Sequence, residues 1–206
     1  MFAHPHIIIA DDHSMIRKGI KLLLVTQFGY KNIYEVNSCN ELFVELKRTP
    51  ATHLVLDIIF ADGTAMEVIA TLRQLYPELK IMIFSMQLPE VYAEVFRNHS
   101  IHYFLEKSTN EDKTVSYLRK FFSDEPPPNR NPFSTTSKNN PFTLLSPREL
   151  EILHYMLNGH KTNVIAQNLN LSNSTVSTIK RRIFEKTDTN SVAQVLELAM
   201  LYNINY

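Results

Sequence analysis

Polar side chains that suit phosphoryl chemistry follow several apolar segments of the sequence. They are Asp11 and Asp12 after residues 7–10, Asp57 after residues 53–56, Ser85 at the end of residues 81–85, and Lys107 after residues 103–105. If these segments are parallel strands, their carboxyl ends meet at one edge of the sheet. Three adjacent carboxylates repel one another unless a cation neutralises them, and Mg²⁺ prefers such oxygen ligands. The pattern therefore predicts an acidic Mg²⁺ pocket.

One aspartate of this pocket could attack a phosphoryl donor and form an acyl phosphate. The lysine and the serine hydroxyl would then hold the remaining phosphoryl oxygens. Taken singly, each residue has a simpler interpretation, because an Asp after a strand is often a helix cap and Lys107 could lie at the surface. Asp11 and Asp12, with Ser14, could merely cap the first helix. The joint occurrence of all five at the appropriate strand ends, in the appropriate order, favours the phosphoryl site.

Alternating strand and helix patterns must position these residues. We expect strands at residues 6–10, 33–36, 53–56, 81–85 and 103–105, and helices at residues 15–25, 40–46, 65–75, 90–98 and 111–122. Several of the strands are continuously apolar, as parallel strands buried on both faces are. The pattern predicts an α/β fold with a doubly wound, five-stranded parallel sheet.

The rest of the chain follows a different pattern. Residues 124–141 contain five prolines and many Ser, Thr and Asn residues, which predict a linker. Beyond it we expect a small all-α domain with helices at residues 147–157, 162–169, 174–186 and 191–201. The predicted organisation is residues 1–123, a linker at 124–141, and residues 142–206.

The second and third of these helices have the pattern of a helix-turn-helix. Ser146, Pro147 and Glu149 open the domain with a capping box. Val176, Ile179 and Ile183 form an apolar stripe on the third helix, whose other face is basic. Such a helix can enter the major groove of DNA, although an ordinary helical hairpin with a solvated charged face has the same pattern.

Composition limits the classes of protein to which the chain can belong. Apolar residues make up 44% of the 206 residues, with no run long enough for a membrane span and no evident signal peptide. We therefore expect a cytoplasmic protein, with the single Cys39 as a small buried residue. Because the net charge is zero, DNA contacts must come from a local cluster, of which Lys180-Arg181-Arg182 with Lys186 is the obvious one.

Residues 6–122 resemble the receiver domain of two-component response regulators, a flavodoxin-like fold. The likeness rests on Ile8-Ile9-Ala10-Asp11-Asp12-His13 and on the stretch from Leu54 to Glu67 around Asp57. The resemblance implies that Asp57 accepts the phosphoryl group, and that Asp11, Asp12, Asp57 and the backbone carbonyl of Ile59 hold Mg²⁺. It also implies that Ser85 is the switch hydroxyl, Phe104 the switch aromatic residue and Lys107 the phosphate partner.

Some positions depart from the family pattern. Proline is usual at Ala61, glycine at Ala65 and a small residue at Met86. Phosphatases with an aspartate nucleophile are an alternative, but they carry an Asp-x-Asp pair where this chain has Asp11-Asp12-His13. We therefore expect no enzyme, and we expect His13 to face solvent.

Residues 144–201 resemble the effector domain of LuxR/FixJ/NarL-type regulators. The likeness rests on residues 145–149, 171–178 and 182–186. It implies base contacts from Ser177, Thr178 and Arg181, and candidate phosphate contacts from Lys161, Lys180 and Arg182. The last helix would form the dimer interface on DNA, or its stripe of Val192, Val195, Leu196 and Ala199 would merely close the core.

These resemblances together imply a DNA-binding transcriptional response regulator. Its partners would be a sensor histidine kinase, double-stranded promoter DNA and a second copy of the chain when phosphorylated or DNA-bound, with no membrane partner. The alternative is a receiver that acts as a protein-interaction module and lacks sequence-specific DNA readout.

Overall fold

The computed structural model describes residues 5–123, 125 and 140–204. Within these residues the chain forms an N-terminal α/β unit and a C-terminal all-helical unit. The predicted linker, residues 124–141, lies almost entirely outside the described residues. The two units are described in turn.

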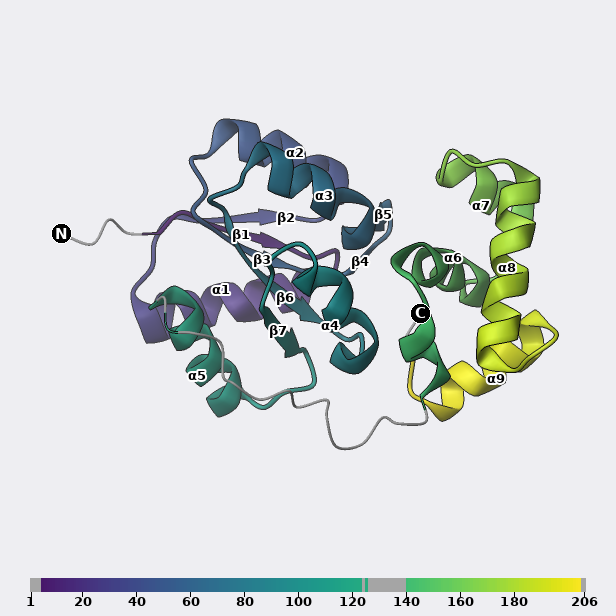
Figure 1. Ribbon diagram of the computed structural model, residues 1–206. Coiled ribbons are helices and arrows are strands. Elements are labelled where there is room, and N and C mark those ends of the chain that lie inside the picture. Colours follow the sequence, from purple (N-terminus) through teal and green to yellow (C-terminus); the bar gives the residue numbers. More distant parts are fainter. Residues whose placement is uncertain (1–4, 124, 126–139, 205–206) are drawn as a thin grey trace. The chain divides into compact units, whose positions relative to one another are not determined.

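The N-terminal unit is built on a five-stranded parallel sheet in the order β2-β1-β3-β6-β7 (Figure 1). Its strands are β1 (Ile7–Ala10), β2 (Ile33–Val36), β3 (His53–Leu56), β6 (Lys80–Ser85) and β7 (Tyr103–Glu106). The helices are α1 (Ser14–Phe28), α2 (Cys39–Arg48), α3 (Ala65–Leu75), α4 (Pro89–Arg97) and α5 (Glu111–Phe122). This topology confirms the predicted doubly wound sheet.

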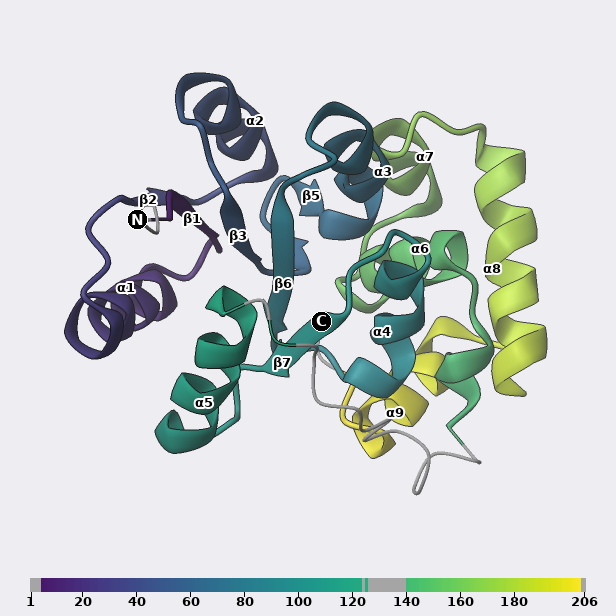
Figure 2. The ribbon, with the colours of Figure 1, turned by 60° about the vertical axis from the view of Figure 1, so that its left-hand side comes forward.

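Both faces of the sheet are covered by helices (Figure 2). Successive strand residues point to opposite faces, so Ile7 and Ile9 lie on one face and Ile8 on the other. The face of Ile7 and Ile9 packs against Ile20 and Leu24 of α1 and against Leu118 and Phe121 of α5. All four residues of β1 are buried, as are those of β3, which explains the apolar runs at residues 7–10 and 54–56.

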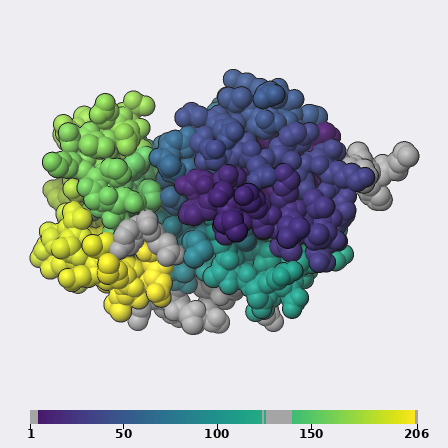
Figure 3. Space-filling view, turned by 180° about the vertical axis from the view of Figure 1, so that it is seen from behind, coloured from purple at the N-terminus to yellow at the C-terminus, as the bar shows by residue number. Residues whose placement is uncertain are grey.

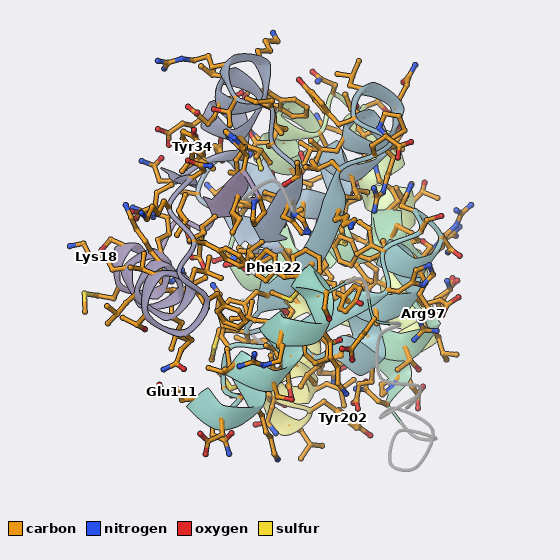
Figure 4. The ribbon with its side chains drawn as sticks, turned by 90° about the vertical axis from the view of Figure 1, so that its left-hand side faces the viewer. Lys18, Tyr34, Arg97, Glu111, Phe122 and Tyr202 are labelled. Atoms are coloured by element: carbon orange, nitrogen blue, oxygen red, sulfur yellow. The ribbon has the colours of Figure 1, made fainter. Side chains whose placement is uncertain are left out.

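An aromatic cluster closes the amino-terminal edge of this sheet. Phe122, labelled in Figure 4, has ring centroids 5.0 Å from Tyr30, 5.0 Å from Phe121 and 4.9 Å from His53. Beside it lies a cavity of about 930 Å³ whose lining includes Pro5, His6, Tyr76, Lys80 and Phe122. This cavity holds none of the candidate site residues, and those of the acidic pocket lie at the opposite, carboxyl ends of the strands.

A short antiparallel hairpin follows Asp57 and was not predicted. It pairs β4 (Ile59–Phe60) with β5 (Gly63–Thr64), so that Ile59 faces Thr64 and Phe60 faces Gly63. Gly63 has a φ of +150°, which other residues rarely adopt. The hairpin leads directly into α3, where Thr64 N–H donates to Glu67 Oε1 over 3.1 Å at the first turn.

The C-terminal unit comprises a short 3₁₀ helix, η1 (Pro141–Leu144), and α6 (Pro147–Leu157), α7 (Thr162–Asn168), α8 (Asn173–Thr187) and α9 (Val192–Leu201). η1 was not predicted, and it begins inside the segment assigned to the linker. The capping box of Ser146 and Glu149 is present as predicted. Ile152, Ile165, Val176 and Ile183 are fully buried and form part of the core of this unit.

Among the described residues, no helix is both long and apolar enough to cross a membrane. The outer surface of α1 is exposed and belongs to the purple region of the space-filling view (Figure 3). Exposed apolar residues of α1 include Met15, Leu22 and Val25.

Candidate functional site

Lys107 joins two carboxylates that come from different strands. Its Nζ lies 2.5 Å from Asp57 Oδ2 and 2.7 Å from Asp11 Oδ2. Asp11 follows β1, Asp57 follows β3 and Lys107 follows β7, so the parallel sheet brings together three residues that are distant in the sequence. Only 2% of the Lys107 side chain is exposed, which excludes the interpretation of Lys107 as a surface lysine.

Asp57 is buried and both of its carboxylate oxygens have partners. The Ser85 hydroxyl donates to Asp57 Oδ1 over 2.6 Å, and the backbone N–H of Ile58 donates to the same oxygen over 2.7 Å. Burial raises the pKa of Asp57, the nearby Lys107 opposes this effect, and the Asp11 carboxylate adds to it. The result is a desolvated carboxylate held in one orientation by a cation and a hydroxyl, as a nucleophile requires.

The acidic residues at this edge are close enough to share one cation. Ligand atoms of Asp11, Asp12, His13 and Asp57 lie within 4.8 Å of one another. Asp12 Oδ1 is buried and accepts no hydrogen bond, although His13 Nδ1 lies 2.8 Å from it. A buried carboxylate oxygen without a donor, beside two further carboxylates, suits a hard divalent cation such as Mg²⁺.

The carbonyl of Ile59 is not used in the hydrogen-bond ladder of its hairpin. In an antiparallel pair, hydrogen-bonded and non-hydrogen-bonded residue pairs alternate. Ala65 N–H donates to the Ile58 carbonyl over 2.7 Å, so the next pair, Ile59 with Thr64, is a non-hydrogen-bonded one. The Ile59 carbonyl therefore points away from the hairpin partner.

The alternative that Asp11 and Asp12 merely cap α1 is wrong. The N-cap position is His13, and no side chain caps the helix there. Asp11 Oδ1 instead accepts the His13 N–H over 2.9 Å, in a turn before the helix. The His13 side chain is 67% exposed, as expected from the sequence.

Phe104 lies in the middle of β7, opposite Ile83 of β6. It is half-buried, its N–H donates to Tyr117 Oη over 3.1 Å, and its ring packs edge-on to Phe96 with centroids 6.4 Å apart. Met86, which follows Ser85, is 48% exposed, so its bulk is not packed into the acidic pocket.

The helix α8 presents a polar outer face. Ser177, Thr178, Arg181 and Arg182 are exposed, while Val176 and Ile183 on the opposite face are buried. Lys161 is exposed at the start of α7, and Lys180 is half-buried with its Nζ 3.4 Å from Thr162 Oγ1. Arg181 Nε lies 3.6 Å from Glu185 Oε1. Five of the six predicted DNA contacts are therefore accessible on α7 and α8, and Lys180 is partly so.

Lys186 is partly exposed, but its ammonium group is paired within the C-terminal unit. Its Nζ lies 2.6 Å from Glu149 Oε2 and donates to the Leu144 carbonyl over 3.0 Å. Sequence reasoning grouped it with the basic cluster because it lies four residues after Arg182. The sequence carried only an indirect signal for this ion pair, the capping-box residue Glu149 at the start of α6.

The apolar stripe of α9 divides between the core and the surface. Val195 and Ala199 are fully buried, so they close the core. Val192 is 36% exposed and Leu196 is half-buried. These exposures are compatible with both roles considered for the stripe, which are to close the core and to form a dimer interface on DNA.

Comparisons with known proteins agree with both units. Residues 7–119 match the family model described as response regulator receiver domain, and residues 143–199 match bacterial regulatory proteins, luxR family. The oxygen regulatory protein NreC of Staphylococcus haemolyticus is 29% identical over 94% of this chain and 96% of its own length. The virulence regulator BvgA of Bordetella pertussis is 28% identical over 96% and 98%.

A solved structure shows the same fold over nearly the whole chain. RcsB of Salmonella enterica serovar Typhimurium, bound to promoter P1flhDC in the presence of phosphomimetic BeF3-, has a TM-score of 0.81. It is 23% identical, and the match covers 95% of this chain and 98% of that one.

Proposed function

Because the chain belongs to the response regulators that join a receiver domain to a LuxR-family domain, we propose that phosphorylation of Asp57 controls its function as a DNA-binding transcription regulator. The observation that carries the proposal is the convergence of Lys107, Ser85 and Asp11 on the buried Asp57. Both families are regulator types rather than classes of enzyme. The proposed domains are residues 1–123, a linker at 124–141, and residues 142–206.

Each residue of the pocket has a defined part in the transfer. A carboxylate oxygen of Asp57 forms a bond to phosphorus while the bond from phosphorus to the donor's leaving atom breaks. Lys107 and the Ser85 hydroxyl then bind phosphoryl oxygens, because both already contact the carboxylate. Asp11, Asp12, Asp57 and the Ile59 carbonyl would hold Mg²⁺, which neutralises charge that develops on the phosphoryl oxygens.

The proposed output is binding to double-stranded promoter DNA through α8. Ser177, Thr178 and Arg181 would contact bases, and Lys161, Lys180 and Arg182 would contact phosphates. BvgA is named as a transcription regulator, and the RcsB structure holds promoter DNA, which supports this assignment by similarity. The protein would act in the cytoplasm, and its partners would be a sensor histidine kinase and a second copy of the chain.

Intact-mass spectrometry tests the phosphoryl acceptor. With Mg²⁺ and acetyl phosphate, the parent protein should gain one base-labile phosphoryl group. Asp57→Asn should gain none, because an amide is not a nucleophile of comparable strength. Equal uptake by parent and variant would show that another residue is the acceptor.

A further inference from the structure

Asp62, in the turn between β4 and β5, binds the start of α2 with both of its carboxylate oxygens. Oδ1 accepts the Cys39 N–H over 2.9 Å, and Oδ2 accepts the Asn40 N–H over 3.1 Å. The first N–H groups of a helix have no partner within the helix, and a carboxylate stabilises them. The next N–H, that of Glu41, is capped by Ser38 Oγ at 3.0 Å, so the two caps serve different groups.

This contact holds the tip of the hairpin, while other contacts hold its base. At the base, Ala65 N–H donates to the Ile58 carbonyl, and Thr64 is joined to Glu67. The turn itself consists of Ala61 and Asp62, and Ala61 replaces the proline that the family resemblance implies. Alanine does not fix φ as the proline ring does, so the geometry of the tip depends more on contacts with the rest of the domain.

The start of α2 also lies beside the acidic pocket. The Asp11 N–H donates to the Val36 carbonyl over 3.2 Å, and Val36 is only three residues before Cys39, the first residue of α2. The start of α2 is therefore connected by a short segment to the residue that pairs with the Asp11 end of β1. A contact between α2 and the hairpin can thus fix the position of the hairpin relative to the pocket.

We propose that Asp62 is a positioning residue: by tying the β4–β5 hairpin to the start of α2, it holds the Ile59 carbonyl at the cation site of Asp11, Asp12 and Asp57. This role rests on the proposed function, because it assumes that these groups bind Mg²⁺. Residues that orient metal ligands contribute strongly to affinity even though they do not touch the metal.

Isothermal titration of Mg²⁺ into the full-length protein tests this role. The chain has no tryptophan, so calorimetry is preferable to intrinsic fluorescence. Asp62→Ala should weaken Mg²⁺ binding about tenfold, at the lower end of the range for such supporting residues. Asp62→Asn, which keeps one acceptor oxygen, should fall between Asp62→Ala and the parent. In hydrogen exchange, the Cys39 and Asn40 amides of Asp62→Ala should lose protection.

Glu41→Ala is the matched control. Glu41 Oε2 accepts the Asn37 N–H over 2.7 Å, so this change also removes a carboxylate from the start of α2 but leaves the hairpin contact intact. Its Mg²⁺ affinity should stay near that of the parent. Equal losses in Asp62→Ala and Glu41→Ala would assign the effect to α2 stability and overturn the proposal.

The remaining outcomes separate this role from the proposed function. Asp12→Ala should lose most Mg²⁺ binding, since it removes a ligand. If Asp12→Ala is deficient but Asp62→Ala binds like the parent, the role of Asp62 is overturned while the cation site stands. If the parent itself does not bind Mg²⁺, both are overturned. Should Asp62→Ala fail to fold, Asp62→Asn provides the same comparison.

Discussion

Lys186 joins the end of α8 to the start of α6 through a buried carboxylate. Glu149 is 4% exposed and is also part of the capping box with Ser146. Burial alone would raise the pKa of Glu149, but hydrogen bonds from Lys186 and Ser146 outweigh it and hold this pKa below its usual value. Removing one partner of such a pair leaves the other buried without compensation.

Lys186→Ala should therefore destabilise the C-terminal unit by about 1–3 kcal/mol. A carboxylate with a lowered pKa stabilises the fold above its unfolded pKa, 4.5 here, and this contribution is lost as the pH falls through the folded value. The difference in melting temperature between parent and variant should thus be full near pH 7 and shrink as the pH falls below 4.5.

Thermal unfolding followed by circular dichroism measures this effect. Arg182→Ala is the control, because it removes an exposed cation from the same helix. A melting temperature for Lys186→Ala equal to that of Arg182→Ala at pH 7 would mean that the ion pair contributes nothing.

At the scale of elements, the DNA contacts proposed for α8 divide into residues that would contact bases and residues that would contact phosphates. Arg181→Ala should cost about 1–3 kcal/mol on a specific site and relax base preference. Lys180→Ala should weaken all sequences alike and flatten the salt dependence by about one unit. Titrations of labelled DNA at several salt concentrations measure both effects. If both variants bind like the parent, α8 does not lie in the major groove.

Most elements were predictable because each carries a long, regular pattern. The strands were placed within one residue, and helices such as α3, α5 and α6 matched at both ends. The β4–β5 hairpin has two-residue strands, which are too short for any alternation to be recognised. η1 follows a proline-rich stretch, where a single turn of helix leaves no periodic apolar pattern.

The acidic pocket was predictable for a related reason. The carboxyl ends of parallel strands meet at one edge of the sheet. The positions of Asp11, Asp57, Ser85 and Lys107 at strand ends were therefore enough to predict that they lie together. The contacts of Asp62 and Lys186 span 23 and 37 residues and follow no periodicity. Such contacts depend on how whole elements pack, which the local sequence does not encode.

At the scale of the whole molecule, charge limits how the protein can bind DNA. The net charge is zero, so one α8 helix has little general attraction to DNA to support it. Two copies on paired half-sites would multiply a weak contact by raising the local concentration of the second helix. If phosphorylation favours dimers, it would therefore raise the affinity for paired half-sites in DNA.

Ser85 is the residue through which this coupling should pass. The Ser85 hydroxyl already contacts Asp57. A phosphoryl group on Asp57 adds about two negative charges, and the hydroxyl can move to donate a hydrogen bond to it. Its movement would leave room for the neighbouring Phe104 to turn inward. Ser85→Ala should accept the phosphoryl group yet lose most of the gain in DNA affinity.

The most direct test measures DNA affinity and mass in solution for the parent and Asp57→Asn, each with and without acetyl phosphate. Sites are first selected from genomic fragments with the phosphorylated parent, whose loading is checked by intact mass. Phosphorylation should shift the parent toward dimer and tighten binding to paired half-sites by about 5–150-fold, a typical range for coupling between sites. Asp57→Asn should not respond. Unchanged affinity and unchanged molecular mass in a fully phosphorylated parent would contradict the claim that Asp57 controls DNA binding.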